Sequence, residues 1–152
     1  MKSETWLSAY TKTGDSSFHP LFVWWHSLSH RLITALSVDS GYSSASIRER
    51  VYFRRNPDSG EFYGGVLLYT TQTGGDGSLG GLIALVPQFE RVLSIARRNI
   101  HSCSNDPLCG EQELSEGKPN GAACYACLLV SETSCEFGNI YLDRNLLRET
   151  IL

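Results

Sequence analysis

The sequence predicts an α+β fold: a small mixed domain with a central apolar helix, a β-hairpin or small sheet, and a loop-rich cysteine segment near the C-terminus. Three observations predict it. An apolar segment from residue 20 repeats large side chains at helical spacing. Two strand-like segments flank the turn sequence 56–60. All five cysteines fall between positions 103 and 135, and that region is rich in turn residues.

The predicted elements can be placed along the chain. Residues 1–18 are mostly polar and predict a flexible N-terminal arm, followed by a single domain over 19–152. Pro20 suits the first turn of the central helix, and Gly41 suits its end. A short helix is expected over 43–50, a hairpin with strands on either side of 56–61, a helix over 87–100, and a final helix over 139–147.

Composition restricts the function classes. The chain has 152 residues, 41% apolar and 19% charged, as expected for one globular domain with its own core. The net charge of -3 argues against indiscriminate binding to nucleic acid or anionic membranes. The first residues lack a secretory apolar region, and no apolar run approaches the roughly 18 residues of a membrane span. We therefore expect a cytoplasmic protein with no membrane partner.

The cysteine spacing is the strongest chemical signal. Cys109, Cys124, Cys127 and Cys135 follow the pattern C-x14-C-x2-C-x7-C. Four thiolates can close a tetrahedral zinc shell without an open position, so the pattern predicts a zinc knuckle with one structural Zn²⁺ that supplies folding free energy. Cys103 either replaces Cys109 or stays unliganded. The alternatives are buried free cysteines or a thioredoxin-like redox pair, and no βαβ pattern supports the latter.

A histidine pair and a glycine-rich segment are weaker signals. His26 and His30 lie on one face of the predicted helix, at a spacing that can bind a metal. They are either hydrogen-bonded within the core or part of a second site with Asp76 or Glu49. No glutamate completes H-E-x-x-H, which disfavours a metalloprotease. The glycines of 74–81 favour a flexible turn over an anion-binding loop.

Two arginine-rich stretches could contact phosphates. The first contains Arg48 and Arg50, and the second contains Arg97 and Arg98. Solvated faces or ion pairs are the more usual role of such stretches in an acidic chain, and Arg48 and Arg50 flank Glu49.

Several motifs together resemble a known family. They occur in order at residues 26–30, 46–52, 65–69, 77–82, 104–109, 121–127, 132–136, 139 and 142–144. This set resembles the C-terminal zinc-binding domain of the DrmB family, a component of the DISARM anti-phage system, and the related domain of MrfA-type helicases. The resemblance covers about residues 20–147. It implies a helicase-associated zinc module whose ligands are Cys109, Cys124, Cys127 and Cys135. Helicase motifs and an ATP-binding loop do not occur in the 152 residues.

Three functional hypotheses follow, in this order. The first is a non-enzymatic zinc module that docks onto a helicase or another defence protein, with contacts from Trp24–Trp25 and the apolar end 146–152. The second is direct binding of DNA or RNA through the arginine stretches. The third is a hydrolase that uses His26 and His30, with Asp76 near the glycine-rich segment. The oligomeric state stays open.

Overall fold

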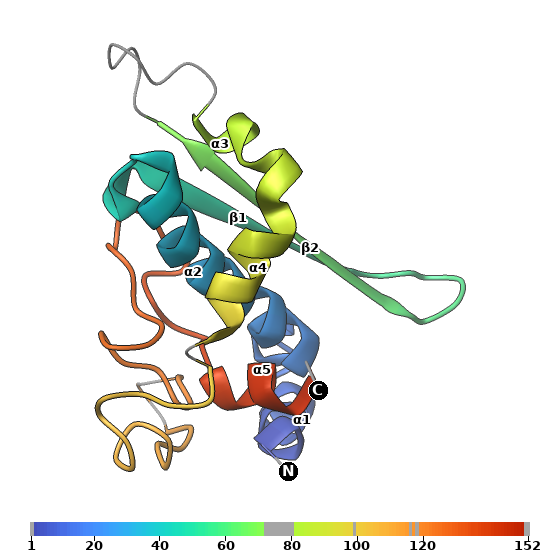
Figure 1. The fold of residues 1–152 in the computed structure, drawn as a ribbon. Coiled ribbons are helices and arrows are strands. Elements are labelled where there is room, and N and C mark those ends of the chain that lie inside the picture. Colours follow the sequence, from blue (N-terminus) through green and yellow to red (C-terminus); the bar gives the residue numbers. More distant parts are fainter. Residues whose placement is uncertain (1, 72–80, 99, 116, 118, 151–152) are drawn as a thin grey trace.

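The computed structural model describes residues 2–71, 81–98, 100–115, 117 and 119–150. Its elements (Figure 1) are helices α1 (Lys2–Thr13), α2 (Pro20–Ser40), α3 (Gly81–Ala84), α4 (Phe89–Arg98) and α5 (Arg144–Thr150), three short 3₁₀ helices η1 (Ser16–Phe18), η2 (Ser44–Ser46) and η3 (Val86–Gln88), and strands β1 (Ile47–Arg55) and β2 (Phe62–Thr70). The mixed α+β class is therefore confirmed. No helix in the described ranges combines the length and apolar character needed to cross a bilayer.

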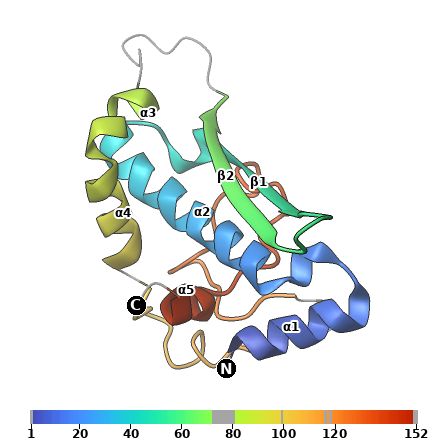
Figure 2. The same ribbon diagram turned by 90° about the vertical axis from the view of Figure 1, so that its right-hand side faces the viewer.

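Helix α2 is the centre of the fold, as its sequence predicts. Pro20 occupies its first turn, His19 Nδ1 accepts a hydrogen bond from the Leu21 amide at 3.2 Å, and Gly41 ends the helix in the left-handed region. The hairpin lies on one side of α2 and α4 on the other (Figure 2). Because both sides are covered, most of the helix is buried.

The hairpin is longer than the sequence predicts. Strands β1 and β2 pair antiparallel from Ile47 opposite Thr70 to Arg55 opposite Phe62. The short helix expected over 43–50 is wrong: only the single turn η2 forms, because the alternation of apolar and charged residues from Ile47 onward matches the period of a strand. Along the outer edge of β1, the Glu49 amide donates to the Ser134 carbonyl at 3.1 Å, which holds the C-terminal segment against the sheet.

The N-terminal residues differ from the expected flexible arm. Residues 2–13 form α1, and Trp6 is buried against Phe22, Val23 and Leu146. The Trp6 indole N–H donates to Asp143 Oδ2 at 2.8 Å. One buried tryptophan removes about 150–250 Å² from water, which is enough to anchor an otherwise polar helix.

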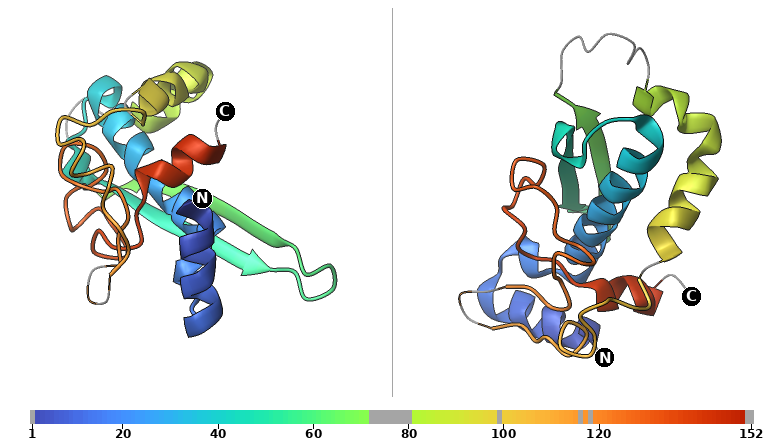
Figure 3. Two further views of the ribbon diagram at one scale, coloured as in Figure 1. Left: turned by 90° about the horizontal axis from the view of Figure 1, so that it is seen from below. Right: turned by 60° about the vertical axis from the view of Figure 1, so that its left-hand side comes forward.

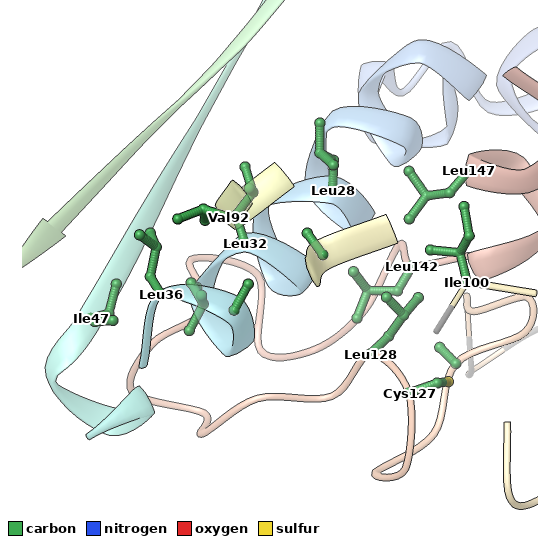
Figure 4. Close-up of a cluster of buried hydrophobic side chains, with 14 of the residues drawn as sticks. Leu28, Leu32, Leu36, Ile47, Val92, Ile100, Cys127, Leu128, Leu142 and Leu147 are labelled. Carbon is green, nitrogen blue, oxygen red and sulfur yellow. The ribbon is translucent and has the colours of Figure 1, made fainter. Parts of the chain in front are cut away.

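The main core joins early and late parts of the chain. Figure 4 shows Leu28, Leu32 and Leu36 of α2 facing Ile47 of β1 and Val92 of α4, and then Ile100, Cys127, Leu128 and Leu142 from the irregular segment. That segment spans 100–143, and its described residues 119–143 run beside α2 (Figure 3). The cysteines thus lie against the hydrophobic core, so metal binding and core packing depend on each other.

Asp143 organises the return of the irregular segment to α5. Its carboxylate accepts hydrogen bonds from the Trp6 side chain and from the amides of Ala122 and Asn145. A Cβ on Gly121 would lie 2.2 Å from the Asp143 carboxylate, so this position requires glycine. Burial raises the pKa of Asp143, although these donors oppose the rise.

Candidate metal centres

Four cysteines form one compact cluster. Their sulfur atoms come from Cys103, Cys109, Cys124 and Cys127 and lie within 4.8 Å of one another. Three of the separations are 3.4 Å for Cys103 to Cys124, 3.6 Å for Cys109 to Cys127, and 3.7 Å for Cys124 to Cys127. A tetrahedral zinc ion with Zn–S bonds of about 2.3 Å requires sulfur atoms about 3.8 Å apart. The cluster therefore fits a zinc tetrathiolate.

Two tight turns present the thiols of this cluster. In the first, the Cys103 amide donates to Asp106 Oδ2 at 2.8 Å, and the Cys109 amide donates to the Asn105 carbonyl. In the second, the Cys127 amide donates to the Cys124 carbonyl at 3.1 Å. N–H donors also point at sulfur: the Cys124 amide lies 3.3 Å from Cys127 Sγ. Such donors stabilise thiolates, the form that binds metal.

The structure rearranges the predicted ligand set. It brings Cys109, Cys124 and Cys127 together, as the spacing suggests, but Cys103 fills the fourth corner and Cys135 lies elsewhere. Spacing alone does not separate the two candidates, because both lie within loop reach of the CxxC turn. The turn around Asp106 folds Cys103 back toward Cys124, and this places Cys103 instead of Cys135 in the cluster.

The electrostatics of the cluster favour a bound dication. Burial and the neighbouring Cys127 and Cys124 raise the pKa of Cys109, and burial is the main cause that raises the pKa of Cys127 to about 11. At Cys124 burial acts in the same direction, but hydrogen bonds from Cys103 and other neighbours outweigh it and lower the pKa to about 7. Without a metal, Cys109, Cys124 and Cys127 therefore do not ionise together, whereas zinc displaces the protons of its thiol ligands.

Two buried arginines flank the cluster and were not singled out as site residues by sequence reasoning. Arg31 donates from Nη1 to the Cys127 carbonyl at 3.0 Å and from Nε to the Ala96 carbonyl at 2.9 Å. Arg144 lies 2.6 Å from Asp106 and interacts electrostatically with Cys127 and Cys109. A zinc ion with four thiolates has a net charge of about -2. The guanidinium groups compensate this charge inside the protein.

A second cluster gathers the histidine pair. His26 and His30 of α2, Glu49 of β1 and Cys135 place their ligand atoms within 4.8 Å of one another. Glu49 Oε1 lies 2.8 Å from His26 Nε2 and 3.1 Å from His30 Nε2, and Cys135 Sγ lies 3.3 Å from His26 Nε2. The two imidazoles and the carboxylate are 0% exposed. Of the two acidic partners considered for the histidines, the structure places Glu49 beside them, whereas Asp76 lies outside the described residues.

The burial of this cluster bears on the hydrolase hypothesis. An acid–base pair must reach its substrate within hydrogen-bond distance. The side chains of His26 and His30 have no exposed surface, and their neighbours occupy both ring nitrogens. The geometry therefore disfavours a role of the pair in hydrolysis. Most of the glycine-rich segment, residues 72–80, lies outside the described residues.

The arginine stretches occupy different elements. Arg48 and Arg50 lie on β1, and Arg50 Nε is 3.5 Å from the Glu136 carboxylate. Arg97 and Arg98 end α4, on the opposite side of α2 from the hairpin (Figure 2). Each stretch would therefore bind a phosphate independently of the other.

The predicted docking residues are only partly exposed. Leu146 and Leu147 are buried in the core, and Trp24 and Trp25 pack edge to face with their rings 5.0 Å apart. The Trp25 ring also covers Gly64 of the hairpin. These residues therefore hold the fold together, and a contact surface must be sought elsewhere.

Comparison with known proteins supports zinc binding. The model of the MrfA Zn-binding domain family matches residues 28–128, a span that contains Cys103, Cys109, Cys124 and Cys127. The chain is also similar to the DISARM protein DrmB of Bacillus paralicheniformis, with 46% identity over 134 residues, which is 86% of this chain and 23% of the relative. It thus spans about a quarter of that relative's length. Because the family model matches more than half of the chain, this protein belongs to the family of MrfA Zn-binding domains and is a zinc-binding domain.

Proposed function

We propose that this domain is a non-catalytic module that zinc holds in shape and that docks onto a helicase or another protein of a DISARM-type defence system in the cytoplasm. The observation that carries the proposal is the four-cysteine cluster, whose geometry fits a closed shell. A zinc ion with four protein ligands has no position for substrate, so its role is to fix the surrounding surface. A reducing compartment suits these thiolates.

An apolar groove offers the docking surface. It measures about 310 Å³ and is lined by Leu32, Leu36, Val66, Leu68, Leu82, Ile83, Leu85, Val86 and Phe89. Its outer rim consists of Ile83, Val86 and Phe89, which are 78%, 66% and 49% exposed. A contiguous apolar surface of this kind is typical of protein–protein contacts.

A pull-down with the tagged DISARM helicase tests the docking. We expect the helicase to retain the zinc-loaded chain, and Ile83→Glu to reduce retention at least about tenfold, because a charge would be buried in the apolar contact. Val38→Glu is the matched control, since Val38 is 73% exposed on α2 and does not line the groove.

Two outcomes would remove parts of the proposal. Equal loss of retention in Ile83→Glu and Val38→Glu would remove the groove as the docking surface. Failure of the wild-type chain to bind the helicase at moderate salt would remove the docking itself.

Nucleic-acid binding remains a second candidate because of the outer face of the hairpin. There Arg50 lies opposite Leu67, Tyr52 opposite Gly65, and Arg54 opposite Tyr63. The three tyrosines of this face, Tyr52, Tyr63 and Tyr69, are all exposed. Single strands bind such faces by stacking bases on aromatic rings while arginines contact phosphates.

Fluorescence anisotropy with labelled single-stranded DNA tests this candidate. We expect Tyr52→Ala and Arg54→Ala each to weaken binding about tenfold, and affinity to fall steeply with salt. Arg98→Ala on α4 is the control and should leave the affinity unchanged. Binding that ignores salt, or that depends on Arg98 instead, would eliminate the hairpin face as the binding surface.

A further inference from the structure

The second cluster, formed by His26, His30, Glu49 and Cys135, joins three distant parts of the chain. The histidines are on α2, the carboxylate is on β1, and the thiol lies in the segment along the edge of β1. All four residues are buried. Buried groups of this kind are stable only when their charges are matched and their hydrogen-bonding atoms are paired.

The backbone fixes the tautomers of both imidazoles. His26 Nδ1 lies 3.2 Å from the Tyr141 carbonyl, and His30 Nδ1 lies 2.8 Å from the Leu128 carbonyl. A carbonyl oxygen only accepts hydrogen bonds, so each Nδ1 must hold a proton. In a neutral ring the lone pair is then on Nε2, and both Nε2 atoms face Glu49 Oε1. This orientation matches that of metal-binding histidines, whose other nitrogen donates to a carbonyl.

Hydrogen-bond donors also contact the two acidic groups of the cluster, the Cys135 thiol and the Glu49 carboxyl group. The amides of Phe137 and Asn139 donate to Cys135 Sγ at 3.3 and 3.2 Å, which stabilises a thiolate. The Ser29 hydroxyl contacts Glu49 Oε2, the carboxylate oxygen that does not face the histidines. A thiolate and a carboxylate together carry two negative charges, and two neutral imidazoles add none. The centre therefore needs either two protons or one divalent cation.

We propose that His26, His30, Glu49 and Cys135 form a second, buried metal site that binds Zn²⁺ independently of the four-cysteine site. Imidazole nitrogen, thiolate sulfur and carboxylate oxygen are the three zinc ligand types, and two histidines four residues apart on a helix can share one ion. One zinc ion neutralises the two anionic ligands. With four protein ligands the site is closed, so its role is to clamp α2, β1 and the Cys135 segment together.

The distances agree with a cation at the centre. Ligand atoms of a tetrahedral zinc site with these donors lie about 3.3–3.6 Å apart. The separations of 2.8, 3.1 and 3.3 Å are a few tenths of an ångström shorter, so a small outward movement of the ligands accommodates the ion. The matched family region, residues 28–128, includes His30 and Glu49 but neither His26 nor Cys135. The completed set is thus a property that the family match does not supply.

Metal analysis of the full chain, expressed with zinc and freed of loosely bound metal by gel filtration, tests the proposal. We expect about two zinc ions per chain. Cys135→Ser and Cys103→Ser should each lower the content to about one, because each removes a ligand from a different site. His101→Gln changes an exposed histidine outside both clusters and should retain about two zinc ions.

Cobalt replacement assigns the ions to the sites. Thiolate-to-cobalt absorption grows with the number of thiolates, so the four-cysteine site should supply about four times as much as the second site. Cys103→Ser should therefore remove most of this absorption, and Cys135→Ser only a small part. If Cys103→Ser kept the full absorption while Cys135→Ser lost its small part, the four-cysteine assignment would be wrong and the second site would stand.

Nitrogen-15 NMR of the wild-type imidazoles keeps the test valid if a variant fails to fold. A zinc-bound ring is neutral with its proton on Nδ1, whereas a ring in a proton-only network is imidazolium with both nitrogens protonated. We expect the neutral form for His26 and His30 in the zinc-loaded chain. One zinc ion per chain, together with two imidazolium rings, would overturn the proposal and assign the cluster to a buried hydrogen-bond network.

Discussion

At the scale of single residues, charge balance governs the four-cysteine cluster. Arg31 is buried and donates to the carbonyls of Cys127 and Ala96, next to four sulfur atoms that become anionic when zinc binds. Burial lowers the pKa of Arg31, while Cys127 opposes that shift. The guanidinium and the tetrathiolate therefore stabilise each other's charge, so each makes the burial of the other less unfavourable.

Arg31→Met tests this dependence. The variant keeps the volume but leaves two carbonyls and an anionic metal site without their donor, so we expect a loss of about 3–5 kcal/mol in unfolding free energy. Denaturant titration of the zinc-loaded chain measures it, and zinc release to a chromogenic chelator should also accelerate. Arg98→Met, on the exposed end of α4, should change the unfolding free energy by less than about 0.5 kcal/mol. Equal effects of both substitutions would show that Arg31 has no special role.

At the scale of elements, the hairpin and α2 are matched in shape. Gly64 of β2 lies under the Trp25 ring of α2, and a Cβ at Gly64 would be 2.2 Å from the nearest ring atom. The adjacent Gly65 faces the other side of the sheet, and a Cβ there would have no atom within 4 Å. Because successive residues of a strand face opposite sides of the sheet, Gly64 has no room for a side chain whereas Gly65 has room for one.

Gly64→Ala and Gly65→Ala form a matched pair. The first forces the indole to move, and we expect a loss of about 1–3 kcal/mol in unfolding free energy. The second adds a methyl group in open space and reduces the entropy of the unfolded chain, so stability should be unchanged or rise by up to about 1 kcal/mol. Thermal and denaturant unfolding of both variants measure the difference. The packing model would be wrong if Gly65→Ala were the more damaging change.

The elements also show how far sequence reasoning extends. Local signals place α2 and the hairpin, because Pro20, Gly41 and the turn at 56–60 act on their immediate neighbours. They do not place Trp6 in the core or choose Cys103 over Cys135, because both outcomes depend on contacts across the fold. Asp143, for example, receives the Trp6 indole from more than a hundred residues away. Sequence patterns thus predict the elements that neighbouring residues determine, but not the contacts between residues far apart in the chain.

At the scale of the whole molecule, the core and the cysteines form one continuous cluster. Cys109, Cys127 and Leu128 pack in the same cluster as Leu28 and Leu32 of α2. A zinc site embedded in this way does not behave as a separate knuckle, because loss of metal exposes core surface. Folding and metal binding should therefore respond as one cooperative unit.

Metal removal tests this cooperativity. After treatment with a high-affinity zinc chelator, we expect amide hydrogen exchange to accelerate in α2 and β1 as well as in residues 100–143, because these segments share the core. Hydrogen exchange followed by mass spectrometry, with the zinc-reconstituted chain as control, measures protection by segment. If α2 stayed fully protected while only 100–130 opened, the core would be independent of the metal.

The position of Cys135 has a consequence for biosynthesis. A ribosome releases α2 and the hairpin well before the cysteine that faces His26, since 109 positions separate the two residues. Until Cys135 emerges, the histidines and Glu49 lack one of the four groups that gather at this site in the folded domain. Completion of the proposed second site is therefore a late step in the synthesis of the domain.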